Sequence, residues 1–536
     1  MQVNAAGAMI MLSPCIGSAR LRIGLVNIYA FRPHVDHLAY LTHLVREGGH
    51  EVRFLTCDAN LPLCYPRALK GTSRLRECAI CRAGGIRSFE SLHVSNLGTT
   101  PGPDLSPDVA ERLAFSSSST LCRTETDNEL DDPDVVAVRD SLATAVKTSY
   151  SASLGWIERE QLDSVICFNG RMDHTRAVTA ACEQVGIPYV THERPWFGHG
   201  LHLTPNENCL AIGALKSLAD QFRQQPLTEP QARLAGRLLG IRFLQQNELE
   251  WRLYNHEPCP APWPTKTDRQ RVLIVPSSRS EFAGHDDWRT PWSSNTEALD
   301  DLLDAWDIKP EQVVLRCHPN WGERIGQVSG ERAQHLYSQW ARSREIFMIA
   351  PEDKASTYDL IRQADLIVMN GGSSAVEAGG CGKPVVNLGP SRYQTAGIVQ
   401  TILSSDEFAQ GHRPIDPDLQ RRLTLRYLYV SAARFPQFVD FVRARSTWAY
   451  DFYAGGEPDR LIDMLRTGEL IADDEETAAD QDAEDSVIEL LAAGNWPGLA
   501  DYDAAVTACT PLRIQRRLAW RWIDTARARF PLGDRW

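Results

Sequence analysis

The sequence predicts an α/β protein built from two doubly wound, Rossmann-like domains and a helical C-terminal extension. The chain has 536 residues, enough for two or three domains of ordinary size. Hydrophobic residues make up 43% of it and charged residues 23%, a balance that allows large buried cores. In two separate parts of the chain, short apolar runs alternate with stretches of helical periodicity. This alternation is typical of parallel sheets covered by helices.

The composition also indicates which binding partners and which cellular compartment to expect. The formal net charge is −13 and no basic run stands out, so we expect no nucleic-acid partner. No stretch of about 18 apolar residues occurs, which predicts no transmembrane helix. Residues 1–20 lack a basic start before their apolar run and are interpreted as a ragged extension, not a secretory signal. We expect a cytoplasmic protein, with peripheral association with the inner face of the membrane left open.

The first domain is expected over residues 1–255. Residues 22–57 show a strand, a helix that stops at two glycines, and a second strand. Residues 84–140 carry turn signals such as GTTPGPDLSP, followed by the acidic stretch ETDNELDDPD, and predict an irregular insertion. The helix and strand pattern resumes over residues 149–194. A helical stretch is expected over residues 210–255.

The second domain is expected over residues 256–415 and begins with the Pro-rich linker HEPCPAPWPTKTDRQ. The strand patterns RVLIV, EQVVL, ADLIVM and KPVVNL alternate there with helical ones. Residues 416–536 predict a helical extension. It contains the acidic stretch ELIADDEETAADQDAEDSV, interpreted as a solvated linker, and the basic segment RIQRRLAWRWIDTARARF. For the basic segment, packing against the protein is favoured over a membrane-surface role.

Polar turns follow three strands of the second domain, where open α/β sheets bind ligands. The first turn consists of Asn370, Gly371, Gly372, Ser373 and Ser374. Its glycines allow a ligand to approach the backbone closely, and the helix start that follows favours a phosphate. Glu377, one turn later, could accept a hydrogen bond from a ribose or sugar hydroxyl. The alternative is a capping box in which Glu377 only closes the helix turn.

The other two turns carry basic side chains. Arg316 and His318 stand at the end of EQVVL, where a histidine can donate to a phosphate or protonate a departing phosphate oxygen. Ser277 and Arg279 lie in PSSRS, and a guanidinium suits phosphate oxygens. A loop histidine with a structural hydrogen bond and a plain Ser-rich turn are the alternatives. The convergence of all three turns would be more specific than any one of them.

Four cysteines form the pattern C-x6-C-x13-C-x2-C after a strand. They are Cys57, Cys64, Cys78 and Cys81. The close pair suits tetrahedral thiolate ligation, for which zinc is the first candidate. The wide first spacing is unlike that of an ordinary zinc ribbon, and four thiolates also hold iron–sulfur clusters. Free or redox thiols are the remaining alternative. A bound metal would stabilise a long loop and would take no part in catalysis.

Several of these segments resemble a known family. HPN, the helix STYDLIRQ and ADLIVMNGGSSAVEAGGCGKPVVNLGPSRYQTAG resemble the donor half of bacterial capsule and surface-polysaccharide glycosyltransferases, including capsule Kdo transferases and bacterial sialyltransferases. In the amino half, RPHVDHLAYLTHLVREGGHEV, CDANLPLC, FNGRMDHTRA and PYVTHER are similar to surface-polysaccharide transferases. The resemblance spans about Arg22 to Val399 without the insertion. It implies the GT-B fold, in which two Rossmann-like domains face a cleft.

The resemblance also implies an activity. A sugar would move from a nucleotide-activated donor to a glycan or lipid-linked acceptor in surface polysaccharide biosynthesis, and CMP-, UDP-, GDP- or TDP-linked donors all fit. His318, Ser373 and Ser374 would hold the donor phosphate, and Glu377 would contact the nucleoside or sugar. No metal cofactor is expected for catalysis. A sugar-nucleotide epimerase or hydrolase of the same architecture, and a non-catalytic assembly partner, are the alternatives.

An inverting transfer needs a base within reach of the acceptor hydroxyl, and the amino half should supply it. The candidates are Glu193, His192, Asp173, Asp36 and His34. Glu193 is preferred because it lies at the end of a predicted strand. The alternative role for Glu193 is an ion pair with Arg194 or Arg171 that only holds the loop.

Overall fold

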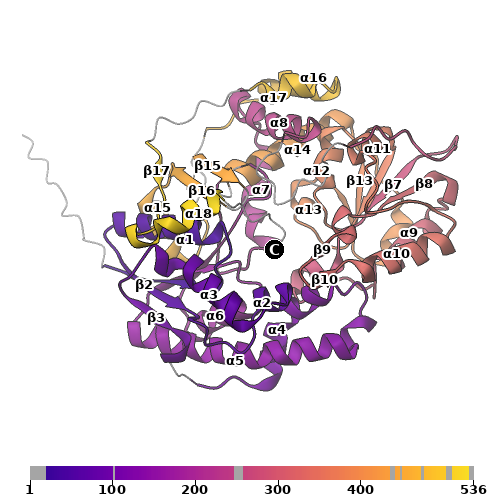
Figure 1. Cartoon of the computed structure of the whole chain (residues 1–536). Coiled ribbons are helices and arrows are strands. Elements are labelled where there is room, and N and C mark those ends of the chain that lie inside the picture. The colour runs from indigo at the N-terminus through magenta and orange to yellow at the C-terminus, as the bar shows by residue number, and fades with distance from the viewer. Residues whose placement is uncertain are drawn as a thin grey trace, which may run out of the picture.

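The computed structural model describes residues 20–99, 103–198, 200–246, 258–434, 441–446, 449–471, 476–502 and 510–529. Two six-stranded sheets dominate it, and each has helices on both faces (Figure 1). The predicted pair of doubly wound α/β domains is therefore confirmed. The expectation for the amino-terminal extension lies outside the described residues, except for its last residue, Arg20. In the described part of the chain, no helix is long and apolar enough to cross a membrane.

The first sheet has the strand order β3-β2-β1-β4-β5-β6. Its strands are β1 (Arg22–Asn27), β2 (Glu51–Thr56), β3 (Val94–Asn96), β4 (Ser164–Phe168), β5 (Tyr189–Glu193) and β6 (His202–Pro205). All neighbours are parallel except β6, which runs antiparallel to β5. Because the strands are parallel and central, both faces of the sheet must be covered.

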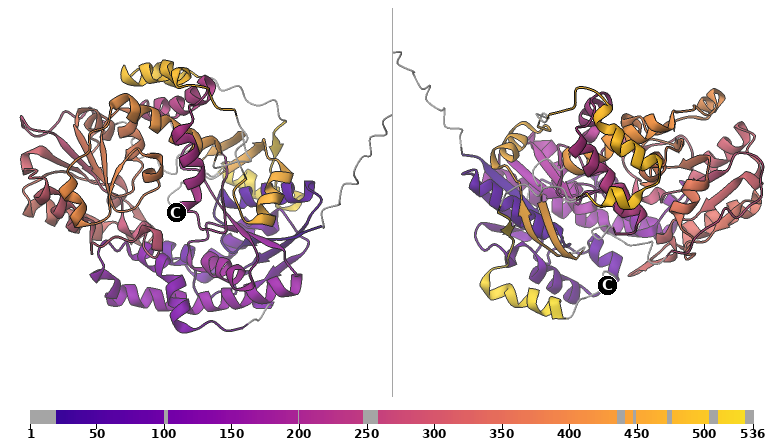
Figure 2. Two further views of the ribbon diagram at one scale, coloured as in Figure 1. Left: turned by 180° about the vertical axis from the view of Figure 1, so that it is seen from behind. Right: turned by 90° about the horizontal axis from the view of Figure 1, so that it is seen from above.

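Alternate residues of β1 point to opposite faces of the sheet and enter two different cores. Ile23 and Leu25 pack with helices α1 and α15, whereas Val26 packs with α4, α5 and α6. The bounds of the helices of this half are α1 (His34–Glu47), α2 (Tyr65–Lys70), α3 (Arg74–Gly84), α4 (Pro107–Cys122), α5 (Pro133–Glu160), α6 (Asp173–Val185) and α15 (Pro458–Thr467). The long α5 runs along the lower side of the molecule in Figure 1 and in the view from behind in Figure 2.

The second sheet has the order β11-β8-β7-β12-β13-β14, and all neighbouring strands are parallel. Its strands are β7 (Val272–Val275), β8 (Val313–Arg316), β11 (Phe347–Ile349), β12 (Leu366–Met369), β13 (Val385–Leu388) and β14 (Gln400–Ile402). A two-stranded hairpin, β9 (Arg324–Ile325) and β10 (Val328–Ser329), stands beside it. The central strands are fully buried on both faces, which explains their continuous apolar runs.

Helices again cover both faces of this second sheet. Helices α9 and α10 pack on one face, and α7, α8, α11, α12, α13 and α14 contribute to the core on the other. Their bounds are α7 (Lys216–Gln224), α8 (Glu229–Phe243), α9 (Asn295–Ala305), α10 (Glu331–Ser343), α11 (Thr357–Gln363), α12 (Ser374–Gly380), α13 (Tyr393–Ala396) and α14 (Pro417–Tyr429). The helical stretch predicted over residues 210–255 appears as α7 and α8, and residues 247–257 are outside the described part.

The irregular insertion predicted over residues 84–140 is wrong. Strand β3, helix α4 and the start of α5 lie within these residues. Helix α4 is rich in serine, which masked its helical pattern, but its hydroxyls have partners inside the protein. Ser117 Oγ accepts a hydrogen bond from the backbone N–H of Asp173 (2.8 Å), and Ser118 Oγ donates to the carbonyl of Phe115 (2.8 Å). A serine side chain satisfied in this way can be buried in a helix.

The segment from α4 to α5 also contacts the second half of the molecule. Arg332 of α10 donates to Asp132 (2.6 Å) and Asp134 (2.8 Å) at the start of α5. The backbone N–H of Asp127 donates to the carbonyl of Ser293 (2.9 Å). These contacts join the two halves on one side of the molecule.

The C-terminal extension contains helices, as predicted, but it also contains a sheet that the sequence did not indicate. Strands β15 (Phe441–Ser446), β16 (Ala449–Ala454) and β17 (Leu512–Arg513) pair antiparallel. The pairing of β16 with β17 joins residues about sixty positions apart, which local patterns cannot reveal. The remaining helices of the extension are α16 (Asp482–Ala492), α17 (Trp496–Ala500) and α18 (Arg521–Arg529).

The extension packs on both halves of the molecule. Helices α16 and α17 lie against α8, whereas α15 contacts α1 (Figure 1). The acidic stretch predicted to be a solvated linker includes the first residues of α16, and there Glu484 is fully buried. Residues 472–475 of that stretch are outside the described part. The expectation of a wholly solvated linker is therefore wrong for its second half.

Candidate functional site

Three polar turns meet at one edge of the second sheet. They follow β8, β7 and β12, which are neighbours in that order. In the middle turn, the Ser277 backbone N–H donates to Asn370 Oδ1 (2.9 Å), and Asn370 Nδ2 donates back to the Ser277 carbonyl (3.1 Å). On the other side, Trp321 Nε1 donates to Ser278 Oγ (2.8 Å). The Ser277–Ser278 turn thus contacts both of its neighbours.

Backbone conformation shapes the turn after β12. Gly371 has a positive φ of 88°, which disfavours a side chain, and its N–H donates to Asn387 Oδ1 (2.6 Å). A Cβ on Gly372 would lie 2.7 Å from Ser277 Oγ, so the two turns approach closely at this point. Ser373 is the N-cap residue of α12, and its side chain makes no capping hydrogen bond. Asn387 was not predicted as a residue of this site. The one feature of the sequence that could have indicated it is its polar side chain within the apolar strand VVNL.

His318 caps the short turn Pro319–Gly322 and is half-buried. Its Nδ1 accepts a hydrogen bond from the Asn320 backbone N–H (3.2 Å). The neutral ring therefore carries its proton on Nε2, where it can donate. This tautomer suits a histidine that binds a phosphate oxygen.

The two arginines of these turns have structural partners. Arg316 is buried and donates to the carbonyls of Ala350 (2.6 Å) and Asp353 (2.9 Å), so it holds the loop after β11. Arg279 Nη2 donates to Asp127 Oδ1 (2.7 Å) of the amino half. Among the described contacts, none joins either guanidinium to the other two turns. The phosphate-binding roles of Arg316 and Arg279 remain predictions.

Glu377 lies one turn into α12 and is buried. Its Oε1 accepts a hydrogen bond from Nε of Arg242 in α8 (2.8 Å), and the two form an ion pair. Its Oε2 is buried and has no hydrogen-bond partner among the described residues. The carboxylate thus joins α12 to α8 and forms no capping box, and its contact with a nucleoside or sugar remains a prediction.

In the amino half, Glu193 stands at the end of β5 within a polar group. Its Oε2 accepts from Asn169 Nδ2 (2.9 Å) and its Oε1 from the Arg194 backbone N–H (2.9 Å). His34 Nε2 lies 3.3 Å from Oε1. Burial raises the pKa of the Glu193 carboxyl, and the two hydrogen bonds partly oppose this rise. The side chain is 18% exposed, so a substrate hydroxyl could reach it.

Three of the other base candidates are more enclosed than Glu193. His192 is 1% exposed, and burial followed by the nearby His34 lowers its pKa to about 3, so its ring stays neutral. Asp36 is also buried and lies 3.3 Å from Arg32. Asp173 is completely buried and accepts hydrogen bonds from the Tyr29 hydroxyl and the Tyr65 backbone N–H. Access to a substrate therefore favours Glu193 over these three.

The alternative ion pair between Glu193 and Arg171 is not among the described contacts. Arg171 Nη1 donates instead to Ser116 Oγ (2.9 Å), Thr120 Oγ1 (3.0 Å) and the Glu281 carbonyl (3.2 Å). Arg171 therefore connects α4 with the turn after β7.

Glu125 is a buried carboxyl beside the donor turns that the sequence did not indicate. Its Oε2 accepts from the Arg279 backbone N–H (3.1 Å), and burial raises its pKa well above the usual value. It comes from the stretch ETDNELDDPD, where it looked like one of several solvated acids. No local pattern distinguishes it from its neighbours.

The four predicted metal ligands gather around one cavity in the amino half. Cys57, Cys64, Cys78 and Cys81 all line it, and its volume is about 190 Å³. Burial raises the pKa of Cys81 to about 12, and neighbouring thiols contribute to the rise. Within the described residues, no group of three or more His, Cys, Asp or Glu side chains is placed to hold a metal ion.

No protein-family model and no curated protein matches the chain. Similar solved structures include the β-Kdo 2,7-transferase KpsC of Thermosulfurimonas dismutans, 15% identical over 63% of this chain and 88% of that one, with a TM-score of 0.31. The UDP-GlcNAc 2-epimerase of Neisseria meningitidis is 12% identical over 83% and 99%, with a TM-score of 0.29. The glycosyltransferase SnogD of Streptomyces nogalater is 12% identical over 78% and 95%, with a TM-score of 0.22. A Kdo transferase, a class of enzyme that the sequence resembles, is thus among the similar structures. TM-scores this low do not distinguish transferases from epimerases.

Proposed function

We propose that the chain is a glycosyltransferase that moves a sugar from a nucleotide-activated donor to a glycan or lipid-linked acceptor in surface polysaccharide biosynthesis. The proposal depends on one observation, the meeting of three polar turns at the carboxyl edge of β8, β7 and β12. Open α/β sheets bind their ligands at this edge. A lipid-linked acceptor would bring the protein to the inner face of the membrane from the cytoplasm.

The donor phosphate binds between the turns. His318 Nε2 donates to a phosphate oxygen, and the backbone around Gly371 and Gly372 allows the phosphate to approach. As the bond between the sugar carbon and the phosphate oxygen breaks, its electrons remain on the nucleotide. Donors held at this position stabilise the resulting negative charge. Ser277, Ser373 and Ser374 supply further hydroxyl and N–H donors.

Glu193 acts as the general base in this proposal. It accepts the proton of the acceptor hydroxyl while that oxygen bonds to the sugar carbon. Its raised pKa supports the role, because a base is most effective when its pKa approaches the working pH. Asn169 holds the carboxylate in one orientation.

Nucleotide binding is tested first, by thermal shift with CMP, UDP, GDP and TDP. A nucleotide that binds the folded chain raises its apparent stability by mass action. His318→Ala should abolish the shift, whereas His335→Ala, on the exposed surface of α10, should leave it unchanged. A shift that survives His318→Ala would place the nucleotide elsewhere.

Activity is tested by incubation with labelled sugar nucleotides. Transfer that requires an added oligosaccharide or lipid-linked acceptor supports the proposal. Glu193→Gln should lower that rate by about 10²–10⁴-fold and keep the nucleotide-induced shift. An epimerised or free nucleotide formed without acceptor would instead assign the epimerase or hydrolase alternative. A folded chain that binds no nucleotide would be a non-catalytic assembly partner.

A further inference from the structure

One side of the segment that follows β17 packs on the amino half of the molecule. The side chain of Arg516 has no exposed area, and its Nη1 donates to the carbonyl of Ala83 (3.3 Å) near the end of α3. Ile523 of α18 is also buried. Asp524 of α18 lies 3.4 Å from Arg32, in the loop between β1 and α1. These contacts hold the segment on the amino half, near α1 and α3 (Figure 1).

The opposite side of this segment exposes large apolar side chains. Leu518, in the helical turn directly before α18, is 79% exposed, and Trp522 of α18 is 64% exposed. Residues four positions apart lie on one face of a helix, whereas the neighbouring Ile523 points into the protein. Single exposed apolar residues are normal on a protein surface, but apolar residues that share an exposed face mark a contact with another surface.

Cations accompany these apolar side chains, although the chain as a whole is acidic. Residues 512–529 contain six arginines and one acidic residue, whereas the net charge of the chain is −13. Arg517, Arg521 and Arg529 are exposed. The described ion pairs of this segment are both formed by Asp524 with other arginines, so neither of them neutralises the three exposed guanidiniums.

Helix α3, to which the segment is anchored, exposes the same kinds of side chain. Leu75 and Ile80 are exposed large apolar residues of α3, and Arg74 and Arg76 are exposed cations. Two adjoining segments of the amino half therefore combine exposed arginines with exposed apolar side chains.

We propose that residues 517–529 bind the surface of an anionic lipid bilayer, with Leu518 and Trp522 in the interface and the exposed arginines at the headgroups. Interfacial segments combine apolar side chains on one face with arginines or lysines that attract anionic lipids. The indole ring of tryptophan favours the level of the headgroups. Because the negative charge of the whole chain opposes its approach to such a bilayer, the attraction must come from a locally basic surface of this kind.

Co-sedimentation of the full chain with lipid vesicles tests the proposal. The vesicles consist of phosphatidylcholine alone, or of phosphatidylcholine and phosphatidylglycerol in equal parts. We expect the chain to bind the mixed vesicles at least about tenfold more strongly, and this binding should weaken as salt is added. A chain that does not bind the mixed vesicles, or that binds both kinds equally, would overturn the proposal. Nucleotide and acceptor are left out, so the result is independent of the proposed glycosyltransferase activity.

Substitutions then assign the surface. Leu518→Ala should weaken binding to the mixed vesicles by about tenfold, and Arg517→Gln should weaken it by about fivefold. The matched controls are Leu419→Ala on α14 and Arg342→Gln on α10, which should bind like the unmodified chain. All four side chains are exposed, so each variant should fold.

Two results would contradict this assignment. The first is unchanged vesicle binding in both Leu518→Ala and Arg517→Gln. The second is a dimer, measured by light scattering without vesicles, that Leu518→Ala dissociates. That dimer would assign the exposed apolar face to a second copy of the chain in place of a bilayer.

Discussion

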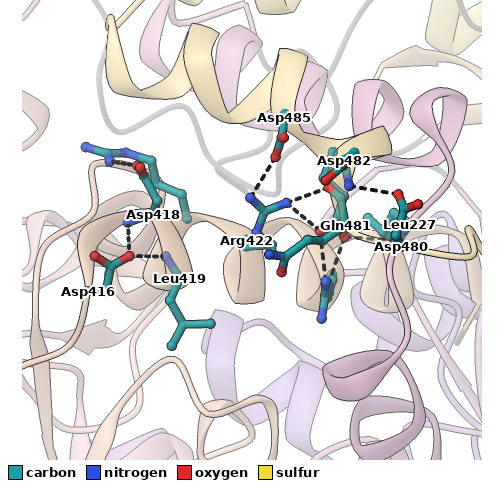
Figure 3. Close-up of polar contacts among 12 residues, drawn as sticks. Leu227, Asp416, Asp418, Leu419, Arg422, Asp480, Gln481, Asp482 and Asp485 are labelled. Carbon is teal, nitrogen blue, oxygen red and sulfur yellow. Dashed lines mark hydrogen bonds and ion pairs between the residues drawn. The ribbon is translucent and has the colours of Figure 1, made fainter.

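Replacing Glu484 with alanine should detach helix α16 from the second half of the molecule. The carboxylate accepts hydrogen bonds from Arg426 Nε and Nη2 (both 2.8 Å), Arg422 Nη1 (3.0 Å) and the Leu227 backbone N–H (2.9 Å). Its side chain has no exposed area. Figure 3 shows Arg422 beside Asp485 and Gln481, and its guanidinium donates to Asp485 Oδ1 (2.8 Å) and to the Gln481 carbonyl (2.8 Å).

The expected loss of stability follows from burial. The side chains of Arg426 and Arg422 are 8% and 11% exposed, so removal of Glu484 leaves two guanidiniums with little access to water. Breaking a buried ion pair by removing one partner destabilises a protein by about 3–5 kcal/mol. Asp485 binds the same Arg422 at 2.8 Å but is 52% exposed. Asp485→Ala should therefore lower stability by less than about 1 kcal/mol.

Hydrogen exchange of the amides in α14 and α16, together with denaturant unfolding, measures both effects. Glu484→Ala should increase exchange in both helices, whereas Asp485→Ala should leave α14 unchanged. The two substitutions share one arginine and differ in burial, which makes them a matched pair. Equal effects from the two variants would refute the argument that burial determines the strength of this contact.

Two further predictions concern the candidate site. Arg242→Ala and Glu377→Ala should each lower the free energy of unfolding by about 3–5 kcal/mol. In a double-mutant cycle measured by denaturant unfolding, the double variant should lose clearly less than the sum of the two single losses. Additive losses would contradict a direct pair. The pKa of His192 is lowered from 6.5 to about 3, so the unfolded chain takes up a proton in this range that the folded chain does not. The contribution of the neutral His192 ring to the free energy of unfolding should therefore be fully present above pH 6.5. At pH 5 it should be smaller by about 2 kcal/mol. Urea unfolding at pH 7 and pH 5 checks the fall, and His192→Asn should reduce it; an unchanged pH dependence in that variant would contradict the assignment.

The sequence predicted the sheets and the three turns for a common reason. A buried parallel strand appears as an apolar run, and the polar residues after it, such as Ser277 and Asn370, mark its carboxyl end. Parallel neighbours then bring these ends to one edge without further information. This part of the site depends on local patterns and simple topology alone.

The buried carboxyls could not be predicted in the same way. Glu125 and Glu484 both come from acidic stretches whose composition indicates exposure to solvent. Each is buried because a distant group binds it, the Arg279 backbone N–H in one case and Arg426 in the other. Partners separated by 154 and 58 positions leave no trace in a local pattern. The serines of α4 misled for a related reason, since Ser117 accepts its hydrogen bond from the backbone N–H of Asp173, on another segment.

The segment from α4 to the start of α5 contacts both halves of the molecule. It contributes to the core under the first sheet through Leu113 and Leu121, and it binds the second half through Arg332. A deletion in this segment would therefore disrupt that core and also remove the ion pairs of Arg332 with Asp132 and Asp134. Raised ionic strength should weaken the exposed part of this hold first, because salt screens its charges. The relative placement of the two halves therefore depends in part on a piece of chain whose sequence resembles a loop.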